Sequence, residues 1–178
     1  MCILSDDDIL RRMRDGSLGI EPFSERGLTP NGYDLRIAEL SVRGGEIVRE
    51  GVAIVPPGKM FYVSTMEAVS LPKDLCAQLW LRSSWIRKGV LSSFGKVDAG
   101  FEGTLTLGSF NASDEELEIP IGERFCQMVL ETMHSAAGED YSSRSGNYQG
   151  QRGITLKPRG PKGSLGRERR RSWWENKS

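Results

Sequence analysis

One aspartate of the sequence lies in a glycine-flanked turn, an arrangement that could present a carboxylate to a ligand. The segment VDAGFEG (97–103) carries Asp98 beside one aromatic residue, Phe101. A carboxylate held in this way could orient or deprotonate a water molecule, and the ring could lie against a sugar or a base. The same pattern fits an ordinary β-turn in which the aspartate hydrogen-bonds its own backbone. The turn alone leaves both interpretations open.

A second segment, LRSSWIRKG (81–89), brings cations and hydroxyls together directly after an apolar run. Guanidinium groups, serine hydroxyls and the N–H groups at the start of a helix are groups that bind polyphosphate. The candidates here are Arg82, Ser83, Ser84 and Arg87. In the alternative, Ser84 caps a helix and the two arginines are solvated.

Two polar residues lie in segments that otherwise predict strands. PNGYDLRI (30–37) places an Asn-Gly turn signal before an alternating strand, and a structural role is favoured for its Asp34. GERFCQMVL (122–130) predicts a buried strand in which Gln127 is the one uncharged polar side chain. A buried polar group needs a partner, and a bound ligand is one candidate.

The polar segment DYSSRSGNYQGQRG (140–153) mixes tyrosine, arginine and glutamine with glycines. Such a segment can be mobile in the free protein and close over a charged ligand, as catalytic lids do. A solvated linker is the alternative. Residues 158–178 predict a mobile basic tail.

Capping residues and hydrophobic periodicity predict the secondary structure around these residues. SDDDILRRMRDG (5–16) predicts a short helix, because Ser5 can cap it, acidic residues favour its N-terminus and Gly16 ends it. The middle of the chain consists of short apolar or alternating runs separated by Gly, Pro, Asn and Asp, which is typical of a β-sandwich or barrel. We therefore expect one all-β domain over residues 1–157, with a short N-terminal helix and an arm at 138–155.

Charge and apolar content limit the class of protein. The 24 basic and 24 acidic residues give a net charge of zero. Residues 156–178 nevertheless hold eight basic and two acidic residues, so this segment carries +6 and residues 1–155 carry −6. An acidic body with a basic tail indicates an anionic ligand or partner near the C-terminus. No apolar run reaches the ~20 residues of a membrane span, and the acidic start differs from a signal peptide, so we expect a cytoplasmic protein.

Few residues of the sequence are suited to soft metals. The three cysteines, Cys2, Cys76 and Cys126, lack paired spacing, which argues against a disulfide framework. The single histidine, His134, is given no role. Zinc nucleobase deaminases need H-x-E and P-C-x-x-C, and neither motif occurs, which argues against a zinc-dependent mechanism.

Taken in order, these segments resemble the dCTP deaminase/dUTPase superfamily, most closely its archaeal-type branch. The likeness covers most of the chain and rests on ILSDDDIL, IEPF, PNGYDLR, RSSWIRKG, VDAGFEG, RFCQMVL and NYQGQRG. It implies a distorted β-barrel of the dUTPase-like, β-clip type. It also implies a homotrimer with active sites between subunits.

The resemblance implies two groups of substrate contacts. The residues that would contact the phosphates are Arg82, Ser83, Ser84, Arg87 and Gln127. On the nucleoside side, Asp98 would lie by the deoxyribose and the catalytic water, Phe101 would pack on the sugar, and the backbone around Thr106 and Leu107 would read the pyrimidine edge.

The same resemblance assigns the C-terminal segment to closure over the nucleotide. Tyr141, Tyr148 and Gln151 match the residues of the family's C-terminal segment that close over the nucleotide. Asn147 stands where many relatives have a lysine, so one phosphate contact of those relatives is changed here.

In the deaminases of this family, the strand after the aspartate turn carries a glutamate that shuttles protons at C4, and this position is Gly108. Since Asp98 is retained, the resemblance predicts a dUTP diphosphatase in which Asp98 activates water for in-line attack at the α-phosphorus. Mg²⁺ would bind mainly through the substrate phosphates and water. The reaction would limit uracil in DNA and supply dUMP for dTTP synthesis.

Two other functions stay open. One is a dCTP deaminase, either monofunctional or bifunctional, with a substitute for the missing glutamate. The other is a non-catalytic nucleotide-binding regulator that acts through RERRRSWW (167–174), whose basic and aromatic residues suit nucleic acid. A solvated tail is the favoured interpretation of that segment, so neither nucleic acid nor a membrane is an expected partner.

Overall fold

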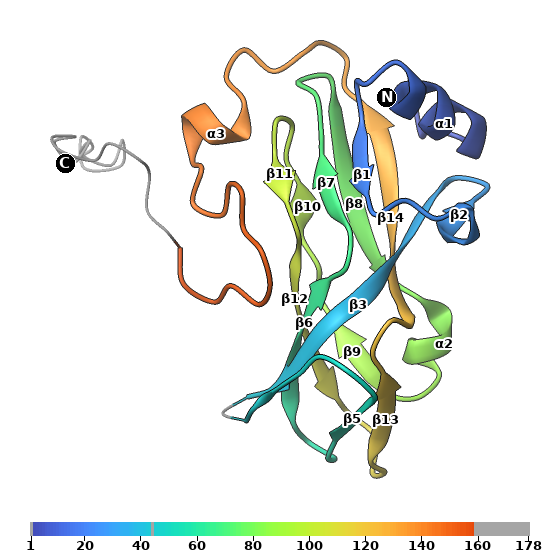
Figure 1. The fold of residues 1–178 in the computed structure, drawn as a ribbon, viewed down its shortest axis with the longest axis vertical. Helices are drawn as coiled ribbons and strands as arrows, with labels where there is room; N and C mark the ends of the chain where they lie inside the picture. The colour runs from blue at the N-terminus through green and yellow to red at the C-terminus, as the bar shows by residue number, and fades with distance from the viewer. Residues whose placement is uncertain (1, 44, 159–178) are drawn as a thin grey trace, which may run out of the picture.

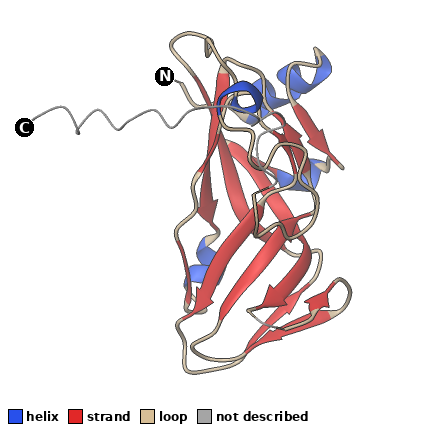
Figure 2. Cartoon of the chain, turned by 90° about the vertical axis from the view of Figure 1, so that its left-hand side faces the viewer, coloured by secondary structure: helices blue, strands red, loops and turns tan. Residues whose placement is uncertain are grey.

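A computed structural model describes residues 2–43 and 45–158 of the chain. The described chain is mostly β and curls into a half-open barrel with short helices at its margins (Figures 1 and 2). The predicted all-β class and distorted barrel are therefore confirmed. The predicted basic tail lies outside the described residues except for Pro158.

The largest sheet runs in the order β10-β8-β14-β3-β6-β12-β9, and neighbouring strands along this path are antiparallel. Two short strands, β2 and β4, pair with β3 off this path. The bounds are β2 Leu28–Thr29, β3 Gly32–Val42, β4 Ile47–Val48, β6 Met60–Thr65, β8 Leu75–Leu81, β9 Val90–Ser92, β10 Lys96–Val97, β12 Thr106–Asn111 and β14 Arg124–Thr132.

Two smaller sheets complete the body. The order β1-β7-β11 joins β1 (Gly19–Glu21), β7 (Ala68–Ser70) and β11 (Glu102–Gly103). A second pair joins β5 (Val52–Val55) to β13 (Leu117–Pro120).

The curl of the large sheet begins in β3. The first half of this strand pairs with β14 and the second half with β6, with a register shift between Ile37 and Glu39. A second register shift lies in β14 between Arg124 and Cys126. Because such irregularities bend a strand and increase its twist, one long strand can serve both halves of the barrel.

The N-terminal helix forms as its capping residues predict. Helix α1 spans Asp6–Arg14, and Ser5 forms a capping box with Asp8. Its acidic first turn and basic last turn both complement the helix dipole. The remaining helical segments are short: η1 (Glu25–Gly27), α2 (Ser83–Ile86) and α3 (Tyr141–Arg144).

An aromatic cluster in the core fixes α2 against the barrel. Phe125 of β14 packs against Phe61, Trp85 and Phe94, with ring centroids 5.9–6.2 Å apart. Trp85 is 3% exposed and donates from Nε1 to the carbonyl oxygen of Arg124 at 2.9 Å. Burial of this one indole therefore sets the orientation of the whole helical turn.

A buried carboxylate ties the loop after β6 to β3. Glu67 is fully buried and accepts from the backbone N–H of Arg36 at 2.8 Å and from its Nε at 2.6 Å. Removing one partner of a buried ion pair leaves the other without compensation. The pair therefore stabilises the curled arrangement locally.

We expect Glu67→Ala to lower the free energy of unfolding by roughly 3 kcal/mol. This is the lower end of the range for breaking a buried pair, because Arg36 is partly exposed and can be hydrated. Urea titration measures the change. The control is Arg11→Ala, which removes an exposed pair with Asp8 and should cost less than about 1 kcal/mol. Equal losses in the two variants would contradict the role given to Glu67.

Candidate functional site

The turn that carries Asp98 presents its carboxylate away from the core. Val97 and Ala99 are buried on either side of the exposed Asp98, and Phe101 N–H donates to the Asp98 carbonyl at 3.1 Å to close the turn. Within residues 2–43 and 45–158, no donor is hydrogen-bonded to the Asp98 carboxylate. The interpretation in which this side chain serves its own turn therefore does not hold in the structure.

A cavity of about 390 Å³ opens beside this turn, and we call it the Asp98 cavity. It gathers all seven of the nucleoside-side and closing residues that the sequence predicts, together with Gly108. Those residues are Asp98, Phe101, Thr106, Leu107, Tyr141, Tyr148 and Gln151. His134 is not among the lining residues.

The predicted arm lies against this same turn. Tyr141 N–H donates to the Ala99 carbonyl at 2.9 Å, and Gly150 N–H donates to the Glu102 backbone carbonyl at 2.7 Å. The Gln149 side chain bridges the two contacts by donating to the Gly100 carbonyl and accepting from the Glu102 N–H. In the described chain, residues 140–151 are thus docked and are not a solvated linker.

Close approach of the arm depends on Gly100. Its φ is +81°, a region that favours glycine, and a Cβ at this position would overlap the Cβ of Asp140. Asp140 in turn caps α3, accepting from Ser142 Oγ, Ser143 Oγ and the Ser143 N–H. Hydrogen bonds from Ser142 and Ser143 lower the pKa of Asp140 to about 2.

The end of the arm is held by contacts that the sequence did not reveal. Gln151 exchanges hydrogen bonds with the backbone of Thr104 at 3.0 and 2.6 Å. Farther on, Glu39 is 8% exposed and accepts from the Ile154 N–H at 2.6 Å while pairing with Arg49 at 3.0 Å. No local signal could have identified Glu39, because it lies 115 residues away from its partner on the arm.

Aromatic and amide groups of the arm form one wall of the Asp98 cavity. The Tyr141 ring meets Phe101 edge-on with centroids 5.4 Å apart, and its hydroxyl accepts from the Tyr148 N–H. Gln151 is 5% exposed, and no described residue donates to its Oε1. The wall therefore offers apolar ring surface together with an acceptor that a bound ligand could satisfy.

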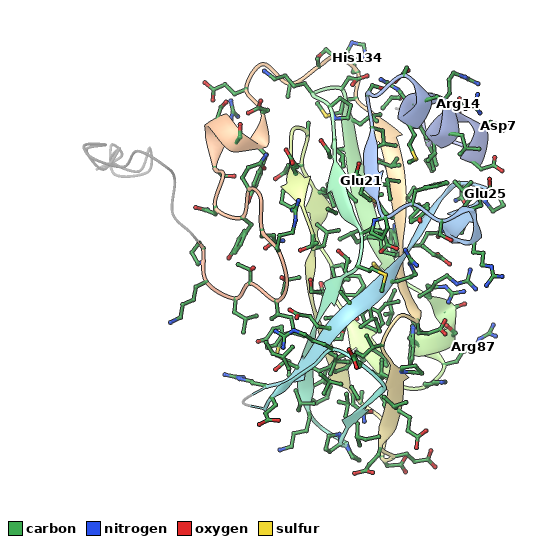
Figure 3. The ribbon with its side chains drawn as sticks, in the orientation of Figure 1. Asp7, Arg14, Glu21, Glu25, Arg87 and His134 are labelled. Atoms are coloured by element: carbon green, nitrogen blue, oxygen red, sulfur yellow. The ribbon has the colours of Figure 1, made fainter. Side chains whose placement is uncertain are left out.

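The predicted phosphate residues lie on a different surface, which we call the α2 surface (Arg82, Ser83, Ser84, Arg87 and Gln127). None of these residues lines the Asp98 cavity. Arg87 lies at the edge of the molecule beside α2, on the opposite side from α3 (Figures 1 and 3). Ser83, Ser84 and Arg87 are exposed, since Trp85 is the residue of α2 that turns inward.

Within the α2 surface, Arg82 is partly neutralised by a buried carboxylate. Its Nε lies 3.0 Å from Asp34 Oδ2, and Arg124 Nη1 lies 3.4 Å from the same oxygen. Burial raises the pKa of Asp34, and the two arginines oppose the rise. Arg82 also precedes α2 as its N-cap residue, so Ser84 is not the cap and Arg82 is not simply solvated.

Gln127 lies next to this ion pair and already has a protein partner. It pairs with Asp34 across β14 and β3, and its Nε2 donates to Thr29 Oγ1 at 2.6 Å. The structure therefore brings Arg82 and Gln127 together around Asp34. It does not bring them to Asp98.

Neither region contains an evident metal centre. Among the described residues, no group of three or more His, Cys, Asp or Glu side chains could hold an ion. Of the described side chains that line the Asp98 cavity, Asp98 is the only carboxylate and Lys96 is the only basic group. No helix of the described chain is long and apolar enough to cross a membrane.

We expect Gly100→Ala to release the arm from the Asp98 turn, because the added Cβ meets Asp140 and the backbone is strained. Amide hydrogen exchange should then rise at residues 141–151. Gly122→Ala is the matched control, since Gly122 has φ +89° but nothing within 4 Å of its Cβ position. Equal amide hydrogen exchange rates at residues 141–151 in the two variants would mean that the close approach of Gly100 to Asp140 does not hold the arm.

Comparison with known proteins gives consistent results. The model of the dCTP deaminase-like family matches residues 3–133. A dCTP deaminase of Pyrococcus horikoshii is 41% identical over 143 residues, which cover 79% of this chain and 90% of that protein. A dCTP deaminase of Caldivirga maquilingensis is 35% identical over 181 residues, covering 90% of this chain and 98% of the relative.

Solved structures share the fold at lower identity. A 2′-deoxycytidine 5′-triphosphate deaminase from Agrobacterium tumefaciens aligns with a TM-score of 0.64 and 23% identity, over 75% of this chain and 49% of that one. A dUTPase of Staphylococcus bacteriophage 80alpha aligns with a TM-score of 0.50 and 21% identity, over 70% and 95%. The predicted superfamily is thus confirmed: by family model and by sequence identity, the chain belongs to the dCTP deaminase-like family.

Proposed function

We propose that this protein is a dUTP diphosphatase, which converts dUTP and water to dUMP and diphosphate. The observation that carries the proposal is that Asp98 is the only carboxylate among the described residues lining the Asp98 cavity. One base is sufficient for this chemistry. It takes a proton from water while the water oxygen bonds to the α-phosphorus. The bond between the α-phosphorus and the oxygen bridging to the β-phosphorus breaks, and its electrons leave with diphosphate.

Deamination would require an additional proton-transfer group in the same cavity. Replacing the amino group at C4 of cytosine requires a proton to be taken from water and a proton to be delivered to the leaving nitrogen. Position 108 of β12 lines the cavity but is a glycine, which has no proton to donate. The proposed reaction therefore uses the carboxylate that is present.

The nucleoside would occupy the Asp98 cavity. Its volume of about 390 Å³ falls in the range of small-molecule sites. Phe101 would pack on the sugar, and the backbone at Thr106 and Leu107 would face the pyrimidine edge. Tyr141, Tyr148 and Gln151 would close the cavity and exclude bulk water.

The triphosphate would require cations that this cavity lacks. Lys96 is its single basic lining residue in the described chain, whereas Arg87 lies exposed on the α2 surface. We therefore propose a homotrimer in which the α2 surface of one subunit completes the Asp98 cavity of the next. Arg82, Ser83, Ser84, Arg87 and Gln127 would then hold the phosphates across the interface.

An apolar groove is the proposed contact between subunits. Trp80, Ile86 and Leu91 are each more than half exposed and line this groove, which shares residues 93–96 with the Asp98 cavity. Exposed apolar patches of this kind mark interaction sites. Head-to-tail packing of identical copies closes into a ring when the rotation permits, and here it would bring one copy's α2 to the next copy's cavity.

Mg²⁺ fits this site through the substrate and not through a protein cage. The described residues offer no cluster of three metal ligands, and Mg²⁺ commonly keeps water and binds phosphate oxygens. When bound, the ion would neutralise phosphate charge. Asp98 would hold the attacking water, and the arm would exclude bulk water.

A dCTP deaminase is the second candidate, because the relatives from Pyrococcus horikoshii and Caldivirga maquilingensis carry that name. The two functions differ in their products, since only deamination releases ammonia. As a dUTP diphosphatase, the protein would limit uracil in DNA and supply dUMP in the cytoplasm.

We predict that purified protein with Mg²⁺ releases diphosphate from dUTP and little or no ammonia from dCTP. The physical reason is the lack of a proton donor at position 108. Both products are measured separately in the same reactions. Ammonia release from dCTP at a rate comparable to dUTP turnover would replace the first function with the second.

We predict that Asp98→Asn lowers dUTP turnover by roughly 10²–10⁴, the usual contribution of general base catalysis. Binding of the non-hydrolysable α,β-imido analogue of dUTP should largely persist, because the amide keeps the size of the side chain. Glu102→Gln is the matched control. Its carboxylate is exposed in the same turn and does not line the cavity. Turnover within a few-fold of wild type would show that Asp98 is not the base, and an inactive wild type would favour the regulator.

A further inference from the structure

Tyr62 is a cavity-lining aromatic residue to which the sequence assigned no role. It lies in β6 directly opposite Gly108 of β12, and both residues line the Asp98 cavity. Residues paired in this way on antiparallel strands present their side chains on the same face of the sheet. The tyrosine side chain and the vacant side-chain position of Gly108 therefore face the cavity together.

The absence of a side chain at position 108 leaves one side of the Tyr62 ring uncovered. A Cβ built on Gly108 would lie 3.7 and 3.8 Å from the ring atoms Cε1 and Cδ1, which is ordinary van der Waals contact. The closest atom to it would be the flexible Met60 Cε at 3.3 Å. A larger residue at 108 would thus cover the ring, whereas glycine leaves room for a flat group beside it.

The Tyr62 hydroxyl has a weak partner. It donates to Met60 Sδ at 3.6 Å, and a thioether sulfur is a poor acceptor. A hydroxyl in this state can exchange its sulfur contact for a stronger carbonyl acceptor at little cost. Tyr62 therefore combines an uncovered ring with an available donor.

We propose that Tyr62 and Gly108 form the base-recognition wall of the Asp98 cavity, with the pyrimidine packed beside the Tyr62 ring and its polar edge within reach of the hydroxyl. This inference rests on the proposed nucleotide site and adds a specificity residue to it. Aromatic side chains suit such a wall because every base has a π-face. Gly108 acts here by leaving space.

The test compares ligands with and without a base. The α,β-imido analogue of dUTP and deoxyribose 5-triphosphate are titrated calorimetrically into full-length wild type and variants. Tyr62→Leu should weaken binding of the imido analogue by roughly 5- to 150-fold, the change that corresponds to one base–aromatic stack. Binding of the base-free triphosphate should change less than about twofold.

Two further variants keep the proposal falsifiable if Tyr62→Leu does not fold. Gly108→Ala should also weaken only the base-bearing ligand, because its Cβ covers the ring, and Tyr62→Phe should retain most of the affinity. Phe110→Leu is the matched control. It lies on the same face of β12, opposite Met60 and outside the cavity, and should change neither ligand.

The outcomes separate this inference from the proposed function. Loss confined to the base-bearing ligand supports the wall even if dUTP is not hydrolysed, in which case only the diphosphatase assignment fails. If Tyr62→Leu and Gly108→Ala weaken both ligands equally, or neither, then Tyr62 is a packing residue and the inference is wrong.

Discussion

The separation of cations from the carboxylate is the constraint on which this account depends. A triphosphate in the Asp98 cavity would meet Lys96 and little other positive charge in the described chain. The candidate phosphate residues lie on the α2 surface of the same chain and do not line this cavity, and Arg82 among them is partly neutralised by Asp34. One copy therefore holds the parts of the proposed site but does not assemble them. In the proposed homotrimer, a second copy would supply these cations.

Core packing positions one of these regions and glycines permit the close contacts of the other, whereas the candidate functional side chains position neither. Burial of Trp85 orients α2 so that its serines and Arg87 face solvent. Gly100 lets the arm approach the Asp98 turn. At Gly153, where φ is +67°, a Cβ would lie only 2.7 Å from Glu39 Oε1. These two glycines therefore permit the close contacts between the arm and the body of the protein. A segment docked on the body by a limited set of hydrogen bonds is well suited to opening and closing around a ligand.

Local sequence signals predicted those features that depend on neighbouring residues. The capping box at Ser5 and Asp8, the turn at Asp98 and the alternating strands all follow from short-range chemistry. Tyr141, Tyr148 and Gln151 line the same cavity as Asp98 in the structure, and their closure over a nucleotide stays a prediction.

Features set by strand register and distant pairing could not be predicted in the same way. Glu39 meets Ile154 across 115 residues, and Tyr62 faces Gly108 only because β6 and β12 pair in one register. Similarly, Asp34 acquires Arg82 and Arg124 as partners through the curl of β3, β14 and β8. No local pattern distinguishes such residues from ordinary strand positions.

Mixing two variants, each defective in a different part of the proposed site, shows whether that site is shared between subunits. Subunits with Asp98→Asn are exchanged with subunits with Arg87→Ala, whose side chain has no ion pair among the described residues, and dUTP turnover is measured after sedimentation confirms mixed assemblies. If each site takes Asp98 from one copy and Arg87 from its neighbour, equal mixing should restore roughly a quarter of wild-type activity in a cyclic assembly. A mixture no more active than its two parents would contradict a site shared between subunits.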